Sequence, residues 1–311
     1  MDEGKRPGII LALLTAIVSG VSVFVNGVTV KNFDPFLFTT LKGILVAVFL
    51  SSILVLLGQI NEIRSLTRKQ WKSLFLIGLI GGSVPFMLFF RGLSIGNSSA
   101  SSFIFRIVFI FAAIISFIYL KEKIDAKFVA GASIILLANF ILIKGDLEFG
   151  FGQLLVLAAT LLWAGEYTYS RKIMQESGLS PRIVAWGRMF FGSAILITLL
   201  CFMGKFSLIE TTSAIQWQGV LITSLFLFAF VSTWYTALKH IEVATATAIL
   251  ALGGPITSVL NLVILGKQLP MIEIASIPLI LAGVAIIIGL RRIWENLAAL
   301  AAKVTGNFSA E

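Results

Sequence analysis

The sequence predicts an all-α, polytopic membrane protein with ten transmembrane helices, arranged as two inverted five-helix repeats, with both termini in the cytoplasm. Three observations predict this fold: the composition, a series of long apolar runs, and an internal repeat. Of the 311 residues, 58% are hydrophobic and only 13% are charged, and the mean hydropathy is +1.00. A soluble domain is closer to half apolar and about a quarter charged, so this composition favours a membrane protein.

Ten apolar runs follow one another along the chain, each near the ~20 residues that a helix needs to cross a hydrocarbon core of about 30 Å. They are continuously apolar instead of alternating, which favours helices over barrel strands. The expected spans are residues 8–29, 36–58, 72–93, 99–120, 126–143, 150–170, 182–203, 217–238, 244–265 and 271–290. The stretches between them are too short to fold as a separate soluble domain.

Lysine and arginine are distributed unevenly over the connections between these runs. With the N-terminus inside, sixteen fall in inner segments and five in outer segments. This positive-inside bias places both termini in the cytoplasm. The net charge of +9 therefore reflects orientation in the membrane, and we expect no nucleic-acid partner.

The second half of the chain repeats the first. Pro35 and Lys42 recur 146 residues later as Pro181 and Arg188. When one residue of the third span is passed over, the offset becomes 145. Before that residue Trp71 recurs as Trp217 at the offset of 146, and after it Phe89-Phe90 recur as Trp234-Tyr235 and Leu93 recurs as Leu238 at the offset of 145.

Each half contributes five spans, and because five is odd the second half enters the membrane from the opposite side. We therefore divide the chain into a first repeat, residues 1–145, a second, inverted repeat, residues 146–290, and a cytoplasmic tail, residues 291–311. Inverted repeats of this kind are a recurring plan of secondary transporters that work by alternating access. The expected function is transport, and the alternative is a duplicated membrane protein with no transport role.

The halves resemble the paired domains of the EamA family in the drug/metabolite transporter superfamily. The resemblance is carried by LLWA (161–164), by the spacing of Pro35/Lys42 and Pro181/Arg188, by GGPITSVLNLVILGKQL (253–269), and by YLKEK (119–123). It implies ten helices around a central cavity and movement of small metabolites, often amino-acid export or drug efflux. The sequence departs from the family in two places. Lys267 or Gln268 stands where a glutamate is usual after the ninth span. A proline that is common in the fourth span is missing, and Ile110 is the residue that corresponds to Pro255.

Only four ionisable side chains fall clearly within the predicted spans and not near their ends, and a charge at mid-bilayer costs about 2.5–3.5 kcal/mol on insertion scales. Glu166 and Arg188 have matching depths near the inner side. One interpretation is a structural ion pair. The other is that Glu166 binds a coupling proton or cation.

Lys42 and Arg106 lie toward the outer side. Lys42 either snorkels to the interface or faces the cavity. For Arg106 we expect a place in the substrate cavity, beside Ser101 and Ser102, where it could bind a substrate carboxylate. The alternative is a structural arginine, capped by carbonyl groups or by a loop acid such as Asp34.

Aromatic pairs and helix breakers suggest moving parts. Phe89 and Phe90 near the outer side correspond to Trp234 and Tyr235 near the inner side, as two gates would, although an interfacial aromatic belt is the other interpretation. The hinge candidates are Pro85, Gly254 and Pro255. By the family resemblance, the first and sixth spans line the cavity, which makes Asn26, Trp163 and Tyr167 candidate lining residues.

Other classes of protein fit less well. With one histidine, one cysteine and no paired acids within the spans, the sequence lacks the residues typical of a zinc or nucleophilic site, so we expect no enzyme, no metal and no cofactor. The chain has no P-loop motif and no repeated filter loop. A non-transporting scaffold or receptor is the remaining alternative from another class.

Among transporters, the leading hypothesis is export of small zwitterionic or anionic metabolites, amino acids first. The runner-up is efflux of lipophilic cations, which would use Glu166 and the aromatic residues, although Arg106 and Lys42 would repel such substrates. The expected partners are a small-molecule substrate, membrane lipid and a proton or cation for coupling, in a monomer or homodimer. The expected location is a prokaryotic plasma (inner) membrane.

Overall fold

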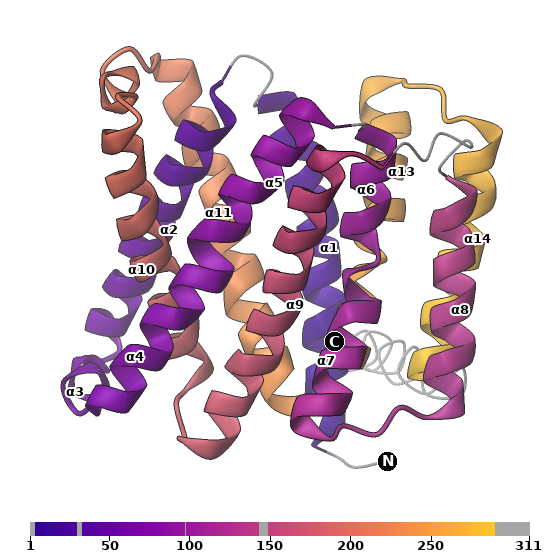
Figure 1. Cartoon of the computed structure of the whole chain (residues 1–311), viewed down its shortest axis with the longest axis horizontal. Helices are drawn as coiled ribbons and strands as arrows, with labels where there is room; N and C mark the ends of the chain where they lie inside the picture. The colour runs from indigo at the N-terminus through magenta and orange to yellow at the C-terminus, as the bar shows by residue number, and fades with distance from the viewer. Residues whose placement is uncertain (1–3, 30–32, 97, 143–148, 290–311) are drawn as a thin grey trace, which may run out of the picture.

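The computed structural model describes residues 4–29, 33–96, 98–142 and 149–289, which form a bundle of helices without any strand (Figure 1). The tail, residues 291–311, lies outside the described residues. In chain order the helices are α1 (Lys5–Thr29), α2 (Pro35–Leu56), α3 (Ile60–Arg64), α4 (Arg68–Ile77), the π-helix η2 (Gly78–Ser83), α5 (Val84–Ile95), α6 (Ser98–Arg106), α7 (Val108–Leu120), α8 (Ala126–Ile141), α9 (Phe151–Glu176), α10 (Pro181–Phe202), the 3-10 helix η3 (Phe206–Ile209), α11 (Ala214–His240), α12 (Val243–Leu250), α13 (Gly253–Leu265) and α14 (Met271–Ile288).

Within the described chain, eight helical segments are long and apolar enough to cross a membrane. They coincide with eight of the ten expected spans. The other two expected spans are helical as well: α8 is a shorter apolar helix of 16 residues, and α9, with 26 residues, carries several charges. The helical membrane fold is thus confirmed, whereas the count of ten spans and the cytoplasmic termini stay predictions.

The two halves begin their second and third helices with the same local structure. Asp34 and Ser180 cap α2 and α10, and each is followed by proline at the first helical position. Thr67 and Ser213 likewise cap α4 and α11 with complete capping boxes. These caps recur at the offset of 146, so the repeat in the sequence is also a repeat in local structure.

Three of the long helices are interrupted. The third predicted span holds the π-helical turn η2 between α4 and α5. The fourth is broken at Ile107, between α6 and α7, and the ninth is broken between Leu250 and Gly253. The break before Pro255 lies where a joint was expected. The break at Ile107 was missed, because no proline or glycine marks it.

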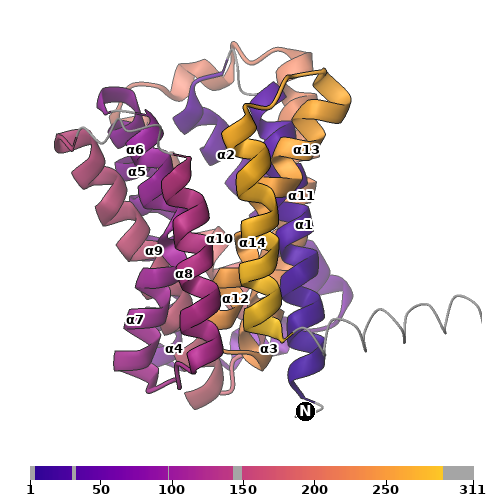
Figure 2. The same ribbon diagram turned by 90° about the vertical axis from the view of Figure 1, so that its right-hand side faces the viewer.

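The helices stand side by side, with α2 and α10 at one side of the bundle and α8 and α14 at the other (Figures 1 and 2). α8 and α14 approach closely at glycines: a Cβ on Gly283 would lie 2.7 Å from the carbonyl oxygen of Gly131. Large apolar side chains such as Ile118 and Val263 point outward, 69% and 73% exposed. Such a surface suits lipid rather than water.

We use two names for the ends of the bundle. The N-terminal end is where α1 begins, α7 and α9 end and α12 begins; the far end is where α2 and α11 begin and α5 ends (Figure 1).

Candidate functional site

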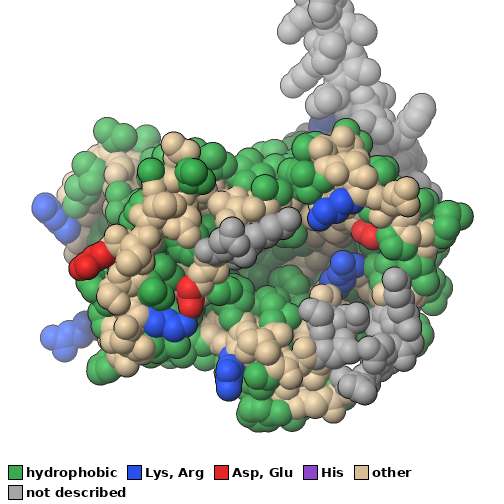
Figure 3. Space-filling view, turned by 90° about the horizontal axis from the view of Figure 1, so that it is seen from above, with side chains coloured by type: hydrophobic (Ala, Val, Ile, Leu, Met, Phe, Trp, Pro, Cys, Tyr) green, Lys and Arg blue, Asp and Glu red, His purple; other side chains and the backbone are tan. Residues whose placement is uncertain are grey.

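A cavity of about 530 Å³ lies between α1, α2, α5, α10 and α11. Its lining reaches the far end of the bundle through Asn26 and Pro35, and the space-filling view from that end shows the surface hollowed there (Figure 3). The lining residues are Val23, Asn26, Gly27, Pro35, Phe38, Thr39, Lys42, Gly43, Gly82, Phe86, Phe90, Leu93, Arg188, Met189, Ser193, Leu196 and Leu227. The cavity is within the ~300–1,000 Å³ usual for small-molecule sites.

Two cations from the two halves of the chain line this cavity. Lys42 on α2 is only 8% exposed, and its Nζ donates to Asn26 Oδ1 at 3.2 Å and lies 5.6 Å from the centre of the Phe38 ring. Arg188 on α10 is 5% exposed, and its Nη2 donates to the carbonyl oxygen of Gly81 at 3.1 Å. Lys42 therefore faces the cavity instead of snorkelling to an interface.

The cavity offers these cations no acidic partner. Its lining contains no aspartate or glutamate, and neither cation belongs to an ion pair within the described residues. Arg188 Nε and Ser193 Oγ are buried without a hydrogen-bond partner. Because unpaired buried donors are costly, this arrangement favours an anionic or acceptor-rich ligand.

Glu166 lies behind the cavity, fully buried on α9. Its Oε1 accepts hydrogen bonds from Tyr235 at 2.7 Å and from Ser170 at 2.5 Å, whereas its Oε2 has no partner. The expected direct ion pair with Arg188 is not formed. Instead, Arg188 lies 6.0 Å from the centre of the Tyr235 ring, so the tyrosine contacts both groups.

The π-helical turn η2 brings these groups together at Gly81. The carbonyl oxygen of Gly81 accepts from Arg188 Nη2 and from Trp163 Nε1, both at 3.1 Å. On the same residue, a Cβ would lie 2.8 Å from Glu166 Cδ. A π-turn holds one residue more than an α-turn, and π-turns are frequent at functional sites. It accounts for the residue that must be passed over to align the third span with the eighth.

The structure places Arg106 away from this cavity. It ends α6, is exposed, and is not among the lining residues. Its electrostatic partner is Glu273, in the first turn of α14. Asp34, the loop acid considered for it, pairs instead with Lys205 at 2.6 Å. The sequence could not show this, because the rotation of an apolar helix about its axis is not encoded in its pattern.

Of the remaining residues predicted to line the cavity, one does so and four lie elsewhere. Asn26 lines the cavity, but Ser101, Ser102, Trp163 and Tyr167 do not. Ser101 is buried and Ser102 exposed. Trp163 and Tyr167 are buried behind the cavity. Trp163 donates a hydrogen bond to a carbonyl oxygen of η2, and Tyr167 packs on the ring of Trp234 on α11.

The two aromatic pairs have different surroundings. Phe90 lines the cavity, and Phe89 packs on Trp163 with 5.5 Å between ring centres. Trp234 and Tyr235 are completely buried, which excludes a place in a lipid-facing aromatic belt. Pro85 is the second residue of α5, just after η2, and Gly254 and Pro255 lie in the first turn of α13.

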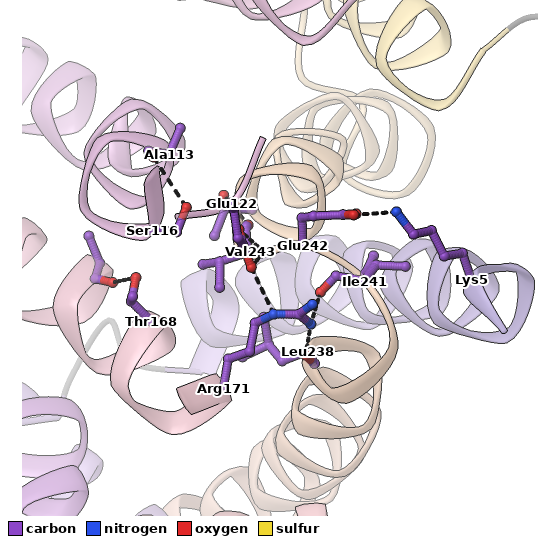
Figure 4. A network of polar contacts seen from close by, with 12 residues as sticks. Lys5, Ala113, Ser116, Glu122, Thr168, Arg171, Leu238, Ile241, Glu242 and Val243 are labelled. Carbon is purple, nitrogen blue, oxygen red and sulfur yellow. Dashed lines mark hydrogen bonds and ion pairs between the residues drawn. The ribbon is translucent and has the colours of Figure 1, made fainter. Parts of the chain in front are cut away.

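A polar network closes the N-terminal end (Figure 4). Arg171 Nε lies 2.7 Å from Glu122 Oε1, and Lys5 pairs with Glu242. Burial raises the pKa of the Glu122 carboxyl above its usual value, although the charge of Arg171 opposes this. Burial acts in the same direction on Glu242, but the hydrogen bond and charge of Lys5 outweigh it and lower the pKa of Glu242. In the sequence, Arg171 is one of the sixteen basic residues assigned to inner segments, and nothing further is predicted for it.

The fold and the cavity are those of a polytopic membrane transporter. A model of the EamA-like transporter family matches residues 6–144 and again residues 150–289. The chain belongs to this family, which confirms the resemblance and sets aside the scaffold or receptor alternative.

One relative agrees with this assignment, and one solved structure shares the fold. An uncharacterized transporter of Archaeoglobus fulgidus is 26% identical over 288 residues, covering 90% of this chain and 98% of the relative. One solved crystal structure is similar with a TM-score of 0.74 and 17% identity, covering 92% of this chain and 99% of that chain. At that identity the second comparison shows the fold alone.

Proposed function

We propose that this protein is a secondary transporter that exports small carboxylate-bearing metabolites, amino acids first, by alternating access. The observation that carries the proposal is that Lys42 and Arg188 face one cavity, and that no aspartate or glutamate among the described residues lines it. These residues are each other's equivalents in the repeat, so each half supplies one cation. A carboxylate would satisfy both, and arginine can bind it by two hydrogen bonds.

The uncharged part of the lining supports a solute with an apolar portion. Phe38, Phe86 and Phe90 contribute aromatic surface, while Asn26 and Ser193 contribute polar groups. Pockets of this composition fix a ligand by a few polar contacts and hold the rest by burial. A zwitterionic amino acid with an apolar side chain fits this chemistry.

Alternating access is supported by the different states of the two ends. The cavity reaches the far end, whereas Trp234 and Tyr235 are fully buried toward the N-terminal end. We propose that Phe89 and Phe90 take the corresponding role when the far end closes. The π-turn η2 before Pro85 and the helix break before Gly254 and Pro255 would serve as hinges.

Efflux of lipophilic cations is the weaker candidate. Glu166 would have to receive the cation, but it does not line the cavity, and Arg188 lies on the lining in its neighbourhood. We place Glu166 instead as a proton- or cation-coupling residue, because its Oε2 is buried without a partner. We further propose a monomer or homodimer in a prokaryotic plasma membrane, with both termini cytoplasmic; the archaeal relative fits this location.

The test is counterflow into proteoliposomes made with the purified protein. Neutral amino acids, dicarboxylates, phosphate esters and lipophilic cations are offered to wild type and to Lys42→Gln and Arg188→Gln. Arg182→Gln is the matched control, because Arg182 lies on the same helix but is exposed and donates to Gln59 at 3.2 Å.

We expect saturable exchange of a carboxylate-bearing solute, at least tenfold weaker in Lys42→Gln and Arg188→Gln, as for loss of a charged hydrogen bond worth about 1.5–3 kcal/mol. Arg182→Gln and Arg106→Ala should exchange like wild type. Exchange of cations that survives both cavity substitutions would overturn the proposed substrate class. Loss of exchange in Arg106→Ala alone would indicate that Arg106, and not the pair in the cavity, binds the substrate carboxylate.

A further inference from the structure

We propose that Glu122 and Arg171 form a latch that holds the N-terminal end closed, and that Lys267 and Val25, their equivalents at the far end, cannot form the same latch. The molecule then rests with its cavity open at the far end. The latch rests on the proposed alternating access but not on the identity of the solute. It can be tested without any substrate, so its failure and that of the proposed substrate class are separate results.

The first half of the latch is Glu122, which follows α7. Its Oε1 lies 2.7 Å from Nε of Arg171 on α9, and the two side chains are only 7% and 11% exposed. The same carboxylate accepts the backbone N–H of Val243 at 3.0 Å. Val243 is the first residue of α12, where free N–H groups attract a negative charge. Glu122 thus joins α7, α9 and α12.

The second half is Arg171, whose Nη1 donates to the carbonyl oxygens of Leu238 and Ile241 (Figure 4). These carbonyls lie at the end of α11, where helices leave acceptors unpaired. Together the two side chains hold both sides of the short connection between α11 and α12. A buried ion pair with further hydrogen bonds at each end is strongly weakened when one partner is removed.

The latch lies between solvent and the packed part of the bundle. Outside it is a hollow of about 500 Å³, lined by Lys5, Glu122, Arg171 and Glu242 among others. On α11, one to two turns before the latched connection, Trp234 and Tyr235 are fully buried. Opening the N-terminal end would have to separate α9 from α11 and α12, and the latch opposes this separation.

The repeat shows that the far end cannot make the same contact. Glu122 corresponds to Lys267: each follows a residue in the left-handed conformation, Lys121 with φ 54° and Gly266 with φ 61°. Each also donates its backbone N–H to the preceding helix, at 3.3 and 3.2 Å. The side chain of Lys267 instead donates to Asn261 at 3.4 Å.

The partner position differs as well. At the offset of 146, Arg171 corresponds to Val25. The far end therefore places a lysine and a valine where the N-terminal end places a glutamate and an arginine. An interaction made in only one of two conformations shifts the population toward it by its full free energy.

The test measures cysteine reactivity in protein reconstituted into nanodiscs, where both ends are accessible. In a Cys201→Ser background, Thr168→Cys reports on the N-terminal end, because Thr168 is 1% exposed on α9, and Thr39→Cys reports on the open cavity. Each reporter is combined with Glu122→Gln, which keeps the size of the side chain and its acceptor oxygen but removes the charge.

The control is Glu176→Gln, which breaks the exposed pair Lys172–Glu176 at 3.8 Å on the same helix. We expect Glu122→Gln to raise the maleimide labelling rate of Thr168→Cys by about tenfold or more and to lower that of Thr39→Cys. Glu176→Gln should change neither rate.

Unchanged rates in Glu122→Gln would overturn the latch. A rise at both reporters would also overturn it, because that pattern means general loosening instead of a switch between ends. Should Glu122→Gln not yield monodisperse protein, Glu122→Asp withdraws the carboxylate by one methylene and must give the same opposed changes.

Discussion

Gly81 is the position where the smallest possible change should disturb the site most. An added methyl group at Gly81 would lie 2.5 Å from Glu166 Cγ and 2.8 Å from Cδ. Gly81 cannot move freely, because its carbonyl oxygen holds both Arg188 and Trp163. Gly81→Ala must therefore displace Glu166 from its 2.7 Å hydrogen bond with Tyr235. Overpacking costs about 1–3 kcal/mol, and a hydrogen bond to a charged group contributes about 1.5–3 kcal/mol.

We expect Gly81→Ala to lower the free energy of unfolding by about 3–5 kcal/mol. The measurement is the thermal unfolding midpoint of purified protein in one detergent. Gly165→Ala is the matched control, since Gly165 lies on the same helix as Glu166 and an added Cβ meets nothing within 4 Å. That variant should gain about 1 kcal/mol from helix propensity. A Gly81→Ala midpoint at or above that of wild type would refute the packing described for the π-turn.

Three further predictions use the same measurement. Asp34→Asn keeps the cap of α2 but loses the charge that pairs with Lys205, so it should cost no more than about 1 kcal/mol at pH 7. Burial alone would raise the pKa of Asp34, but Lys205 and the hydrogen bonds of the cap lower it below 3.8. The difference in stability between wild type and Asp34→Asn should therefore be complete above pH 3.8 and disappear as the pH falls through the lowered pKa. A difference in stability that persists at low pH would contradict this. Gly283→Val should cost about 1–3 kcal/mol by separating α8 from α14, and a neutral result would contradict their close approach. Lys121→Gly should stabilise by about 1 kcal/mol, because Lys121 has a positive φ of 54°; destabilisation would contradict that conformation.

The sequence was sufficient to predict the helices and some of the residues that line the cavity, such as Lys42 and Asn26. Apolar runs locate spans because the hydrocarbon core allows few alternatives, and the repeat paired Lys42 with Arg188 before either was seen in the cavity. The direction of a side chain around an apolar helix is a different matter. Arg106 was placed in the cavity and lies outside it, because an apolar pattern that faces lipid on one side and protein on the other has little periodicity.

Contacts between distant segments were also beyond the sequence. Arg171 looked like one more inner basic residue, and nothing in its surroundings indicated that it reaches Glu122 and the end of α11. The expected pair of Glu166 and Arg188 was correct in placing the two in one neighbourhood but wrong in its contact. Gly81 and Tyr235 stand between them, and neither could be assigned that role without the π-turn.

The π-turn also changes how the two halves can be compared. Successive residues of an α-helix are rotated by about 100° around its axis, since a turn holds 3.6 of them. One additional residue in an unbroken α-helix would turn every later side chain by roughly that angle. The π-turn η2 takes up the extra residue in one wider turn, so the side chains from Val84 to Ile95 keep about the same direction relative to the part before Gly78. α11 has no such turn. The third span and α11 can therefore present corresponding faces although they differ in length by one residue. The extra residue changes the turn itself, where the carbonyl oxygen of Gly81 accepts from Arg188 and Trp163.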